Sequence, residues 1–225
     1  MGKTEKVLKG IAKLVTFKNG YPDGAFNSAV IVAAGNGVRA GGEIPKQFRE
    51  VGGIPVIART VNVFEQCKFI NEIVIVAREG DENIFAEYEQ KYGWKKILRI
   101  VTGKATRQES VFEGFKAMSD SSYYVYIHGG VRCLITPELI EKVGEQACLN
   151  GCAIAAAKAS DSIKISGKGD IISDSPDRST VWQAQTPQVF RTDIYRASAY
   201  TALQSGYSAS DDSMLAEKAG FPVKL

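Results

Sequence analysis

Residues 28–47 read SAVIVAAGNGVRAGGEIPKQ, and this stretch decides the fold. It opens with an apolar, β-rich run over residues 28–33, which predicts a buried strand. A glycine-rich loop follows directly and carries Arg39 and Lys46 as cations at fixed positions. Glycines let a backbone approach a polyphosphate closely and direct N–H groups towards it. The stretch therefore predicts a strand followed by a loop that neutralises a triphosphate and the charge that develops when it is split.

Two other phosphate-binding motifs compete with this interpretation. Residues 35–40 formally match a Gly-x-Gly-x-x-Ala dinucleotide fingerprint, but that motif requires a helix to open there. Gly41, Gly42 and Pro45 prevent a helix within two turns. A Walker A loop ends in Gly-Lys-Ser/Thr, which this stretch lacks. The remaining alternative is a glycine-rich surface turn without function.

Apolar, β-rich runs and amphipathic stretches alternate along most of the chain. We expect strands at residues 28–33, 72–77, 97–101 and 123–127, and helices at residues 56–67, 83–92, 108–118, 137–149, 192–203 and 211–219. Thr136 and Pro137 start one helix as cap and first residue, Gly151 closes it, and Ser210 is the expected cap of the last helix. This alternation predicts an α/β fold with a doubly wound, mostly parallel sheet, which binds ligands at the carboxyl ends of its strands.

A hairpin interrupts this alternation. Residues 161–166 and 170–173 alternate at period two around Gly167-Lys168-Gly169, which predicts two paired strands within an arm at about residues 160–180. An isolated hairpin is only marginally stable in water. We therefore expect the arm to pack on a second copy of the chain and to make it a homodimer.

The composition limits the class of protein. Hydrophobic residues make up 44% of the 225, which is enough to bury the core of one α/β domain. A net charge of +3 is too small to indicate a nucleic-acid partner, but it suits ligands that carry phosphates. No apolar run is long enough to span a membrane and no signal peptide precedes the core, so we expect a cytoplasmic protein with no membrane partner.

Cysteine and histidine usage argues against zinc and disulfides. The four cysteines form no C-x-x-C pair and are expected to stay reduced. The only histidine, His128, ends an apolar strand, where a structural role is the usual one, and we assign it no chemistry. Residues 1–27 are lysine-rich and end in turn-forming residues, so they form an N-terminal extension. A solvated extension and a membrane-surface segment are its two interpretations.

The order of motifs resembles the 2-C-methyl-D-erythritol 4-phosphate cytidylyltransferase family. After residues 33–47, further matching segments follow in order at residues 106–111, 128–132, 161–164 with 178–188, and 210–213. The resemblance covers residues 28–225 and implies a Rossmann-like nucleotidyltransferase domain with a dimerisation arm. It also implies a magnesium-dependent reaction between CTP and a sugar-alcohol phosphate. A phosphate oxygen of 2-C-methyl-D-erythritol 4-phosphate attacks the α-phosphorus of CTP, and pyrophosphate leaves.

This chemistry needs no general base. A phosphate monoester is already largely ionised at neutral pH, because its second pKa is about 6. Two anions must meet instead, so catalysis rests on positioning and on neutralising charge. The resemblance implies that the CTP phosphates hold most of the Mg²⁺ coordination and that no protein side chain is a dedicated metal ligand.

The resemblance also assigns roles to residues of this chain. The implied catalytic residues are Arg39, Lys46 and Arg178; the implied nucleotide-binding residues are Ala33, Ala34, Gly35, Asn36, Gly37, Gly103, Ser110 and Gly130; the implied substrate-binding residues are Arg132, Ser162, Arg178 and Thr186. Ser162 and Arg178 lie on the arm and would reach the acceptor in the other subunit's site. The alternative is that Arg178 is an ordinary solvated charge and Ser162 a polar residue on a strand face.

Three positions depart from the family's pattern. Gly129 stands where the family has aspartate, and Lys104 replaces the second glycine of a Gly-Gly pair. Residues 222–225 start a strand, and the chain ends before the family's final strand and helix, which carry a lysine that holds the acceptor. Two alternatives to the cytidylyltransferase follow. One is a degenerate or truncated homologue that binds nucleotide or dimerises without turnover, and the other is a pentitol-phosphate cytidylyltransferase.

Overall fold

Six strands form the main sheet of this computed structural model, which describes residues 17–18, 21–22, 24–35 and 44–225. Their order is β7–β6–β3–β8–β12–β9. The strands are β3 (Phe26–Val32), β6 (Glu72–Ala77), β7 (Ile97–Thr102), β8 (Ser122–Gly129), β9 (Cys152–Lys158) and β12 (Trp182–Arg191). Strands β7, β6, β3 and β8 pair in parallel, whereas β12 is antiparallel to both of its neighbours. The mostly parallel sheet predicted from the sequence is confirmed.

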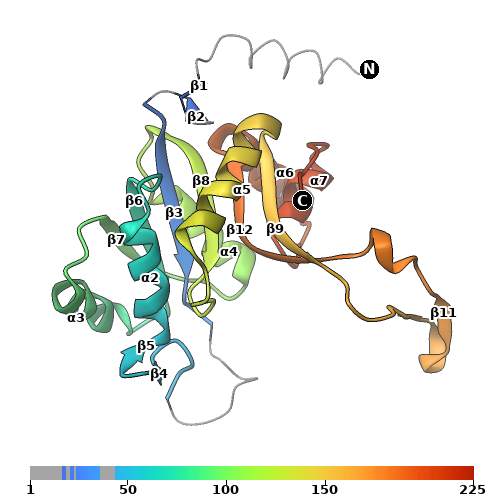
Figure 1. Cartoon of the computed structure of the whole chain (residues 1–225), viewed down its shortest axis with the longest axis horizontal. Coiled ribbons are helices and arrows are strands. Elements are labelled where there is room, and N and C mark those ends of the chain that lie inside the picture. The colour runs from blue at the N-terminus through green and yellow to red at the C-terminus, as the bar shows by residue number, and fades with distance from the viewer. Residues whose placement is uncertain (1–16, 19–20, 23, 36–43) are drawn as a thin grey trace.

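Helices cover both faces of this sheet (Figure 1). The helices α2 (Val56–Gln66), α3 (Glu82–Tyr92) and α5 (Pro137–Asn150) pack on one face, and α4 (Arg107–Lys116), α6 (Thr192–Ser205) and α7 (Ser213–Lys218) pack on the other. Successive side chains of a strand point to opposite faces. In β3, Ile31 accordingly joins the first core and Val30 joins the second. Both faces of the sheet are therefore buried under helices, as in a doubly wound fold.

The sequence located most helix ends to within about two residues. The Thr136 side chain accepts a hydrogen bond from the backbone N–H of Leu139, and Gly151 closes α5, as predicted. Thr106 and Glu109 form a reciprocal capping box at the start of α4. The predicted cap of the last helix is wrong, because α7 begins at Ser213 and Ser210 does not cap it.

Strand β9 was not predicted. Its sequence, CAIAAAK, is rich in alanine, which favours helix, and it follows directly on α5. Pairing with β12 overrides that propensity. The strand predicted at residues 222–225 is reduced to a single bridge. Lys224 pairs in parallel with Ala153, and its backbone bonds to Cys152 and Ile154 at 3.0 and 2.8 Å.

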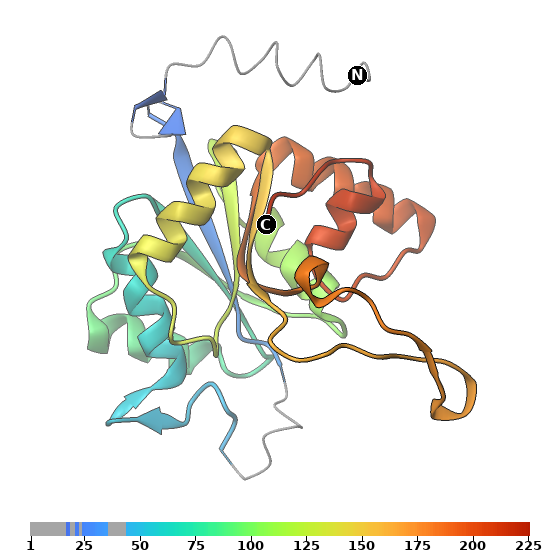
Figure 2. The ribbon, with the colours of Figure 1, turned by 45° about the vertical axis from the view of Figure 1, so that its right-hand side comes forward.

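A long arm leaves the body between β9 and β12 (Figures 1 and 2). Its outer end is a hairpin in which β10 (Ile165–Ser166) pairs antiparallel with β11 (Ile172–Asp174). The paired part is shorter than predicted, because residues 161–164 are not in a strand and a 3-10 turn, η2 (Lys168–Asp170), occupies the connection. Within that turn Gly169 and Asp170 have φ values of 69° and 58°.

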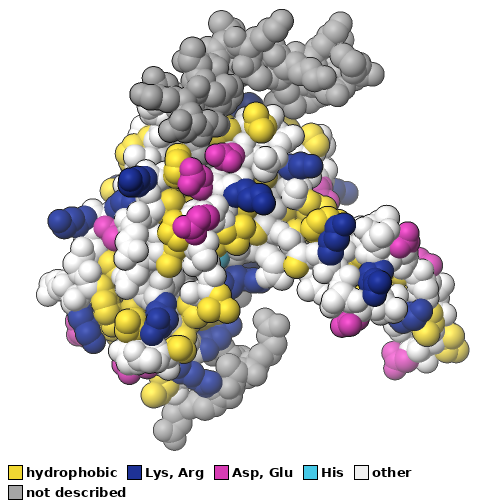
Figure 3. Space-filling view, viewed as in Figure 1, with side chains coloured by type: hydrophobic (Ala, Val, Ile, Leu, Met, Phe, Trp, Pro, Cys, Tyr) yellow, Lys and Arg dark blue, Asp and Glu magenta, His cyan; other side chains and the backbone are white. Residues whose placement is uncertain are grey.

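The hairpin carries apolar side chains that the described part of the chain leaves exposed. Ile165, Ile171 and Ile172 are 46%, 71% and 58% exposed. Figure 3 shows apolar and charged side chains together at the outer end of the arm. Exposed apolar groups gathered on a projecting element are typical of a surface that meets another molecule.

The N-terminal extension falls mostly outside the described residues. Phe26 and Asn27 already belong to β3, and Asn27 is buried, so the folded domain starts slightly before residue 28. None of the helices that the structure describes combines the length and the apolar character needed to cross a membrane.

Candidate active site

The carboxyl ends of the parallel strands open on a cavity of about 860 Å³. Strands β3 and β8 end side by side, since Val32 is in register with Gly129. The antiparallel strand β12 brings its first half to the same edge. Eight residues with predicted roles line the cavity: Ala33, Ala34, Gly35, Lys46, Gly103, Ser110, Arg132 and Thr186. Arg39, Asn36 and Gly37, which also have predicted roles, lie outside the described residues.

Two glycines allow the backbones at this edge to approach each other. Gly103 follows β7, and a Cβ there would lie 2.4 Å from the Cβ of Ala34. Gly130 follows β8, and a Cβ there would lie 2.6 Å from Cδ1 of Ile57. Gly130 is buried and donates its N–H to the carbonyl of Val32 at 2.8 Å. It therefore supports the end of β3 and does not line the cavity itself.

We expect Gly103→Ala to destabilise the protein and weaken nucleotide binding. The added methyl group must displace Ala34, and overpacking of this kind typically costs about 1–3 kcal/mol of unfolding free energy. Thermal denaturation and calorimetric titration with CTP measure the two effects. Gly129→Ala is the matched control for stability, because the atoms nearest to a Cβ at Gly129 belong to the Arg132 side chain and lie at 3.5 Å or more. Equal melting temperatures for both variants would contradict the expectation.

Ser110 fixes the loop between β7 and α4. Its hydroxyl is buried, accepts the backbone N–H of Lys104 at 2.9 Å and lies 3.3 Å from the Lys104 carbonyl oxygen. The backbone at Lys104 is thus held by Ser110, while the lysine itself lines the cavity. Replacing the family's glycine by Lys104 therefore adds a cation to the cavity wall.

The described part of the cavity wall is predominantly basic. The basic residues lining it are Lys46, Arg78, Lys104, Arg107 and Arg132, and the acidic ones are Glu79 and Asp211. Two of the arginines are partly neutralised, because Arg78 and Arg107 form ion pairs with acids outside the lining. A cavity with an excess of cations suits a polyanion.

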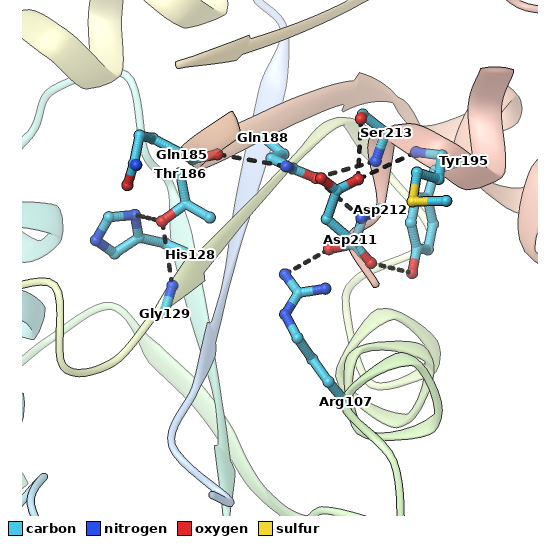
Figure 4. A network of polar contacts seen from close by, with 11 residues as sticks. Arg107, His128, Gly129, Gln185, Thr186, Gln188, Tyr195, Asp211, Asp212 and Ser213 are labelled. Carbon is cyan, nitrogen blue, oxygen red and sulfur yellow. Dashed lines mark hydrogen bonds and ion pairs between the residues drawn. The ribbon is translucent and has the colours of Figure 1, made fainter. Parts of the chain in front are cut away.

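His128 and Thr186 form a hydrogen-bonded pair at the end of β8 (Figure 4). His128 Nδ1 lies 2.8 Å from Thr186 Oγ1, and Nε2 lies 3.2 Å from the carbonyl oxygen of Arg132. A carbonyl oxygen can only accept, so Nε2 carries the proton and Nδ1 accepts from the Thr186 hydroxyl. Burial lowers the pKa of His128 to about 4. His128 is therefore neutral near pH 7 and orients Thr186.

We expect His128 to make the unfolding free energy depend on pH. The folded pKa of about 4 lies below the unfolded value of 6.5, so the unfolded state takes up the proton first. The full contribution is present above pH 6.5 and is lost as the pH falls towards 4, by up to about 3 kcal/mol. Denaturant titrations of wild type and His128→Gln at a series of pH values measure it. Since the chain has one histidine, the difference between the two isolates this group. Parallel curves would contradict the assignment.

A second polar network, which the sequence did not reveal, forms the opposite wall (Figure 4). The buried carboxylate of Asp212 contacts Arg107 Nη2 at 2.6 Å and the Tyr195 hydroxyl at 3.5 Å. Burial raises the pKa of Asp212, although Arg107 opposes this. Gln188 accepts backbone N–H bonds from Asp212 and Ser213. Arg107, Gln188 and Asp212 lie within matching motifs, but a motif alone does not show which of its members face one another.

The arm keeps two of the residues with predicted roles away from this cavity. Ser162 and Arg178 are exposed, and neither lines the cavity of its own chain. Arg178 starts the 3-10 turn η3 (Arg178–Thr180) and donates to the carbonyl oxygen of Ser160 at 2.9 Å. The structure therefore does not bring these two side chains together with the other residues that have predicted roles.

Comparison with known proteins agrees with this geometry. The sequence model of the family "IspD: 2-C-methyl-D-erythritol 4-phosphate cytidylyltransferase" matches residues 28–225. The 2-C-methyl-D-erythritol 4-phosphate cytidylyltransferase of Alkaliphilus oremlandii is 37% identical over 199 residues, which cover 88% of this chain and 84% of that protein. The enzyme of the same name from Caldanaerobacter subterraneus is 36% identical, with 88% of each chain covered.

Solved structures give the same result. The 4-diphosphocytidyl-2C-methyl-D-erythritol synthase of Anaerococcus prevotii superposes with a TM-score of 0.80 at 36% identity, covering 90% of this chain and 86% of that one. The 2-C-methyl-D-erythritol 4-phosphate cytidylyltransferase of Thermus thermophilus superposes with a TM-score of 0.70 at 26% identity, covering 89% and 88%. The motifs, the fold and these relatives together show that the chain is a member of the 2-C-methyl-D-erythritol 4-phosphate cytidylyltransferase family.

Proposed function

We propose that this protein transfers the cytidylyl group of CTP to 2-C-methyl-D-erythritol 4-phosphate and releases pyrophosphate, a step of the non-mevalonate route to isoprenoid precursors. The observation that carries the proposal is the basic cavity in which Lys46, Gly103 and Ser110 meet Arg132 and Thr186. The first three come from the segments implied to bind nucleotide, and the last two from those implied to bind the acceptor.

The arrangement supports in-line attack by a phosphate oxygen. The acceptor phosphate is already ionised, so the reaction requires cations and fixed N–H groups and no proton acceptor. Lys46, together with Arg39 of the same loop, stabilises the charge on the reacting phosphates. The backbone at Ala33, Ala34, Gly35 and Gly103 surrounds the nucleotide. Neutral His128 takes no proton from the acceptor and instead holds the Thr186 hydroxyl in place.

Magnesium is expected to bind mainly through the CTP phosphates. Among the described residues, no group of three or more His, Cys, Asp or Glu side chains could hold a metal ion. Hard cations prefer oxygen ligands, and Mg²⁺ commonly keeps waters and substrate phosphates as most of its shell. No side chain is assigned as a dedicated metal ligand. In the described part of the chain, Asp211 lines the cavity, and its hydrogen bonds to Ser213 and Met214 both use Oδ1, so Oδ2 would be the protein oxygen to offer a supporting contact. The ion would neutralise part of the triphosphate charge.

The arm supports a homodimer in which each chain completes the other's site. Its exposed isoleucines supply apolar area that a projecting hairpin cannot bury alone. A two-fold related partner would place both arms equivalently, and Arg178 and Ser162 would then reach the acceptor in the neighbouring site. The residues before β3 remain an extension without an assigned role, and the cytoplasmic location expected from the sequence stays a prediction.

Pyrophosphate release by the purified chain tests the proposal. CTP and Mg²⁺ are supplied with either 2-C-methyl-D-erythritol 4-phosphate or a pentitol phosphate, and CTP alone is the blank. Turnover with the first acceptor supports the proposal. Turnover only with the pentitol phosphate would show that the protein is a pentitol-phosphate cytidylyltransferase instead. CTP binding by calorimetry without turnover identifies a homologue that has lost catalysis, with Gly129, in place of the family's aspartate, as the first position to restore.

A further inference from the structure

One buried glutamine joins two walls of the cavity. Gln188 lies in β12, and only 1% of its surface is exposed. Its Oε1 accepts hydrogen bonds from the backbone N–H groups of Asp212 and Ser213, at 3.0 Å each. Its Nε2 donates to the carbonyl oxygen of Gln185 at 3.3 Å. The acceptor end of the amide therefore holds the start of α7, and the donor end holds the segment of β12 that faces β8 (Figure 4).

The acceptor end of the Gln188 side chain, Oε1, fixes the cavity wall that carries Asp211. The residue before α7, Asp212, makes no side-chain cap. Gln188 Oε1 instead receives the N–H groups of Asp212 and Ser213, and Asp211 Oδ1 receives that of Met214. Asp211 directly precedes this point and lines the cavity, and the Asp212 carboxylate holds Arg107, which also lines it. A shift of this segment would move both Asp211 and Arg107.

The donor end of the Gln188 side chain, Nε2, fixes the cavity wall that carries Arg132 and Thr186. Gln185 accepts a hydrogen bond from Arg132 Nη1 through its side-chain oxygen, while Gln188 holds its backbone carbonyl. The next residue, Thr186, is held in turn by His128. Both Arg132 and Thr186 line the cavity. The orientation of these two side chains therefore depends on the conformation of residues 185 and 186.

We propose that Gln188 is a positioning residue for the cytidylyl transfer, and the inference rests on the proposed function. It holds Asp211 and Arg107 on one wall at a fixed separation from Arg132 and Thr186 on the other. The position requires an amide, because one end must accept and the other must donate. Displacement of a binding group by about 1 Å can cost on the order of a hundredfold in rate, so a buried residue that holds the binding groups in place can control turnover.

Replacing Gln188 with glutamate tests this requirement. An ionised carboxylate only accepts, so it keeps the bonds to Asp212 and Ser213 but turns a lone pair towards the Gln185 carbonyl. A protonated carboxyl group has one donor and one acceptor and reproduces the amide. Burial near Asp211 and Asp212 raises the pKa of the new group, whereas Arg107 and Arg132 oppose this and Tyr195 and His128 stay neutral.

We expect Gln188→Glu to release pyrophosphate at least about tenfold more slowly than wild type at pH 8, and to recover much of the loss at pH 6. Gln188→Met lacks all three hydrogen bonds and should be slow at both pH values. Gln204→Met replaces an exposed glutamine of α6 and should match wild type. Rates are expressed relative to wild type at the same pH, and kcat and KM are measured for both substrates.

A second readout does not need turnover. Hydrogen exchange at the backbone amides of Asp212 and Ser213 should be faster in Gln188→Met and unchanged in Gln188→Glu, and CTP binding should weaken in Gln188→Met. If wild type itself does not turn over, the proposed function fails, and the exchange and binding data alone decide the role of Gln188. Wild-type kinetics of Gln188→Glu at pH 8, or unchanged exchange in Gln188→Met, would overturn the proposal.

Discussion

Replacing Lys46 with alanine is expected to reduce the rate of pyrophosphate release by about a hundredfold or more, because under the proposed function it removes a cation that faces the reacting phosphates. Lys46 lies in a short turn after Pro45 and lines the cavity. The neighbouring backbone is fixed, since the carbonyl of Gln47 accepts the N–H of Ile57 at 3.0 Å and the carbonyl of Pro45 accepts the N–H of Phe48 at 2.9 Å. The backbone that carries Lys46 is therefore held in place beside the cavity.

The loss should appear mainly in kcat, because the charge that Lys46 neutralises is greatest in the transition state. Lys46→Arg keeps the charge in a different shape and should recover part of the rate. Lys142→Ala removes an exposed lysine of α5 as the matched control and should leave the rate unchanged. Lys46→Ala and Lys142→Ala with equal kcat values would show that this turn does not belong to the catalytic machinery.

Replacing Arg178 with alanine is expected to reduce turnover by a similar factor, although this side chain lies away from the cavity of its own chain. Under the proposed dimer, Arg178 neutralises the acceptor phosphate in the neighbouring site, and two anions approaching each other are sensitive to every missing cation. Arg178 donates one hydrogen bond within the arm, to Ser160, so the substitution should leave the fold intact. Equal melting temperatures and equal dimer mass by light scattering would establish this.

Mixing two inactive variants distinguishes a shared site from a local one. A heterodimer of Lys46→Ala and Arg178→Ala has one site with both substitutions and one site with neither. Random exchange of subunits should therefore restore about a quarter of the wild-type activity. Lys46→Ala alone and Arg178→Ala alone, taken through the same exchange, should recover no activity. Absence of recovery after verified subunit exchange would place Arg178 in its own chain's site or outside catalysis.

The sequence predicted the parallel half of the fold because local signals there agree with tertiary structure. Strand β6 matches the predicted range of residues 72–77, and α5 starts where Thr136 and Pro137 indicate. Strand β9 was missed because its alanines favour helix, and only its neighbour β12 makes it a strand. Pairing partners distant in the chain are not encoded in a local pattern.

The residues of the site likewise fall into those that a local pattern predicts and those that it does not. Glycines 103 and 130 could be selected from motifs, and the structure gives each a steric reason. The link between Arg107 and Asp212 could not be selected, because it joins the start of α4 to the start of α7. The prediction of the α7 cap was wrong for a related reason. Ser210 has the side chain of a typical cap, but Gln188 of β12, across the fold, and Asp211 accept the first amides of the helix.

The antiparallel strand β12 also sets the order in which the chain can fold during synthesis. Strands β3, β6, β7 and β8 pair with one another and are all complete by Gly129. Strand β9 then emerges, yet its main partner, β12, follows only after the whole arm. Until the ribosome has released residue 191, β9 keeps an unpaired backbone edge, which is where a nascent chain associates wrongly with others. The residues of the arm thus determine how long that edge stays open.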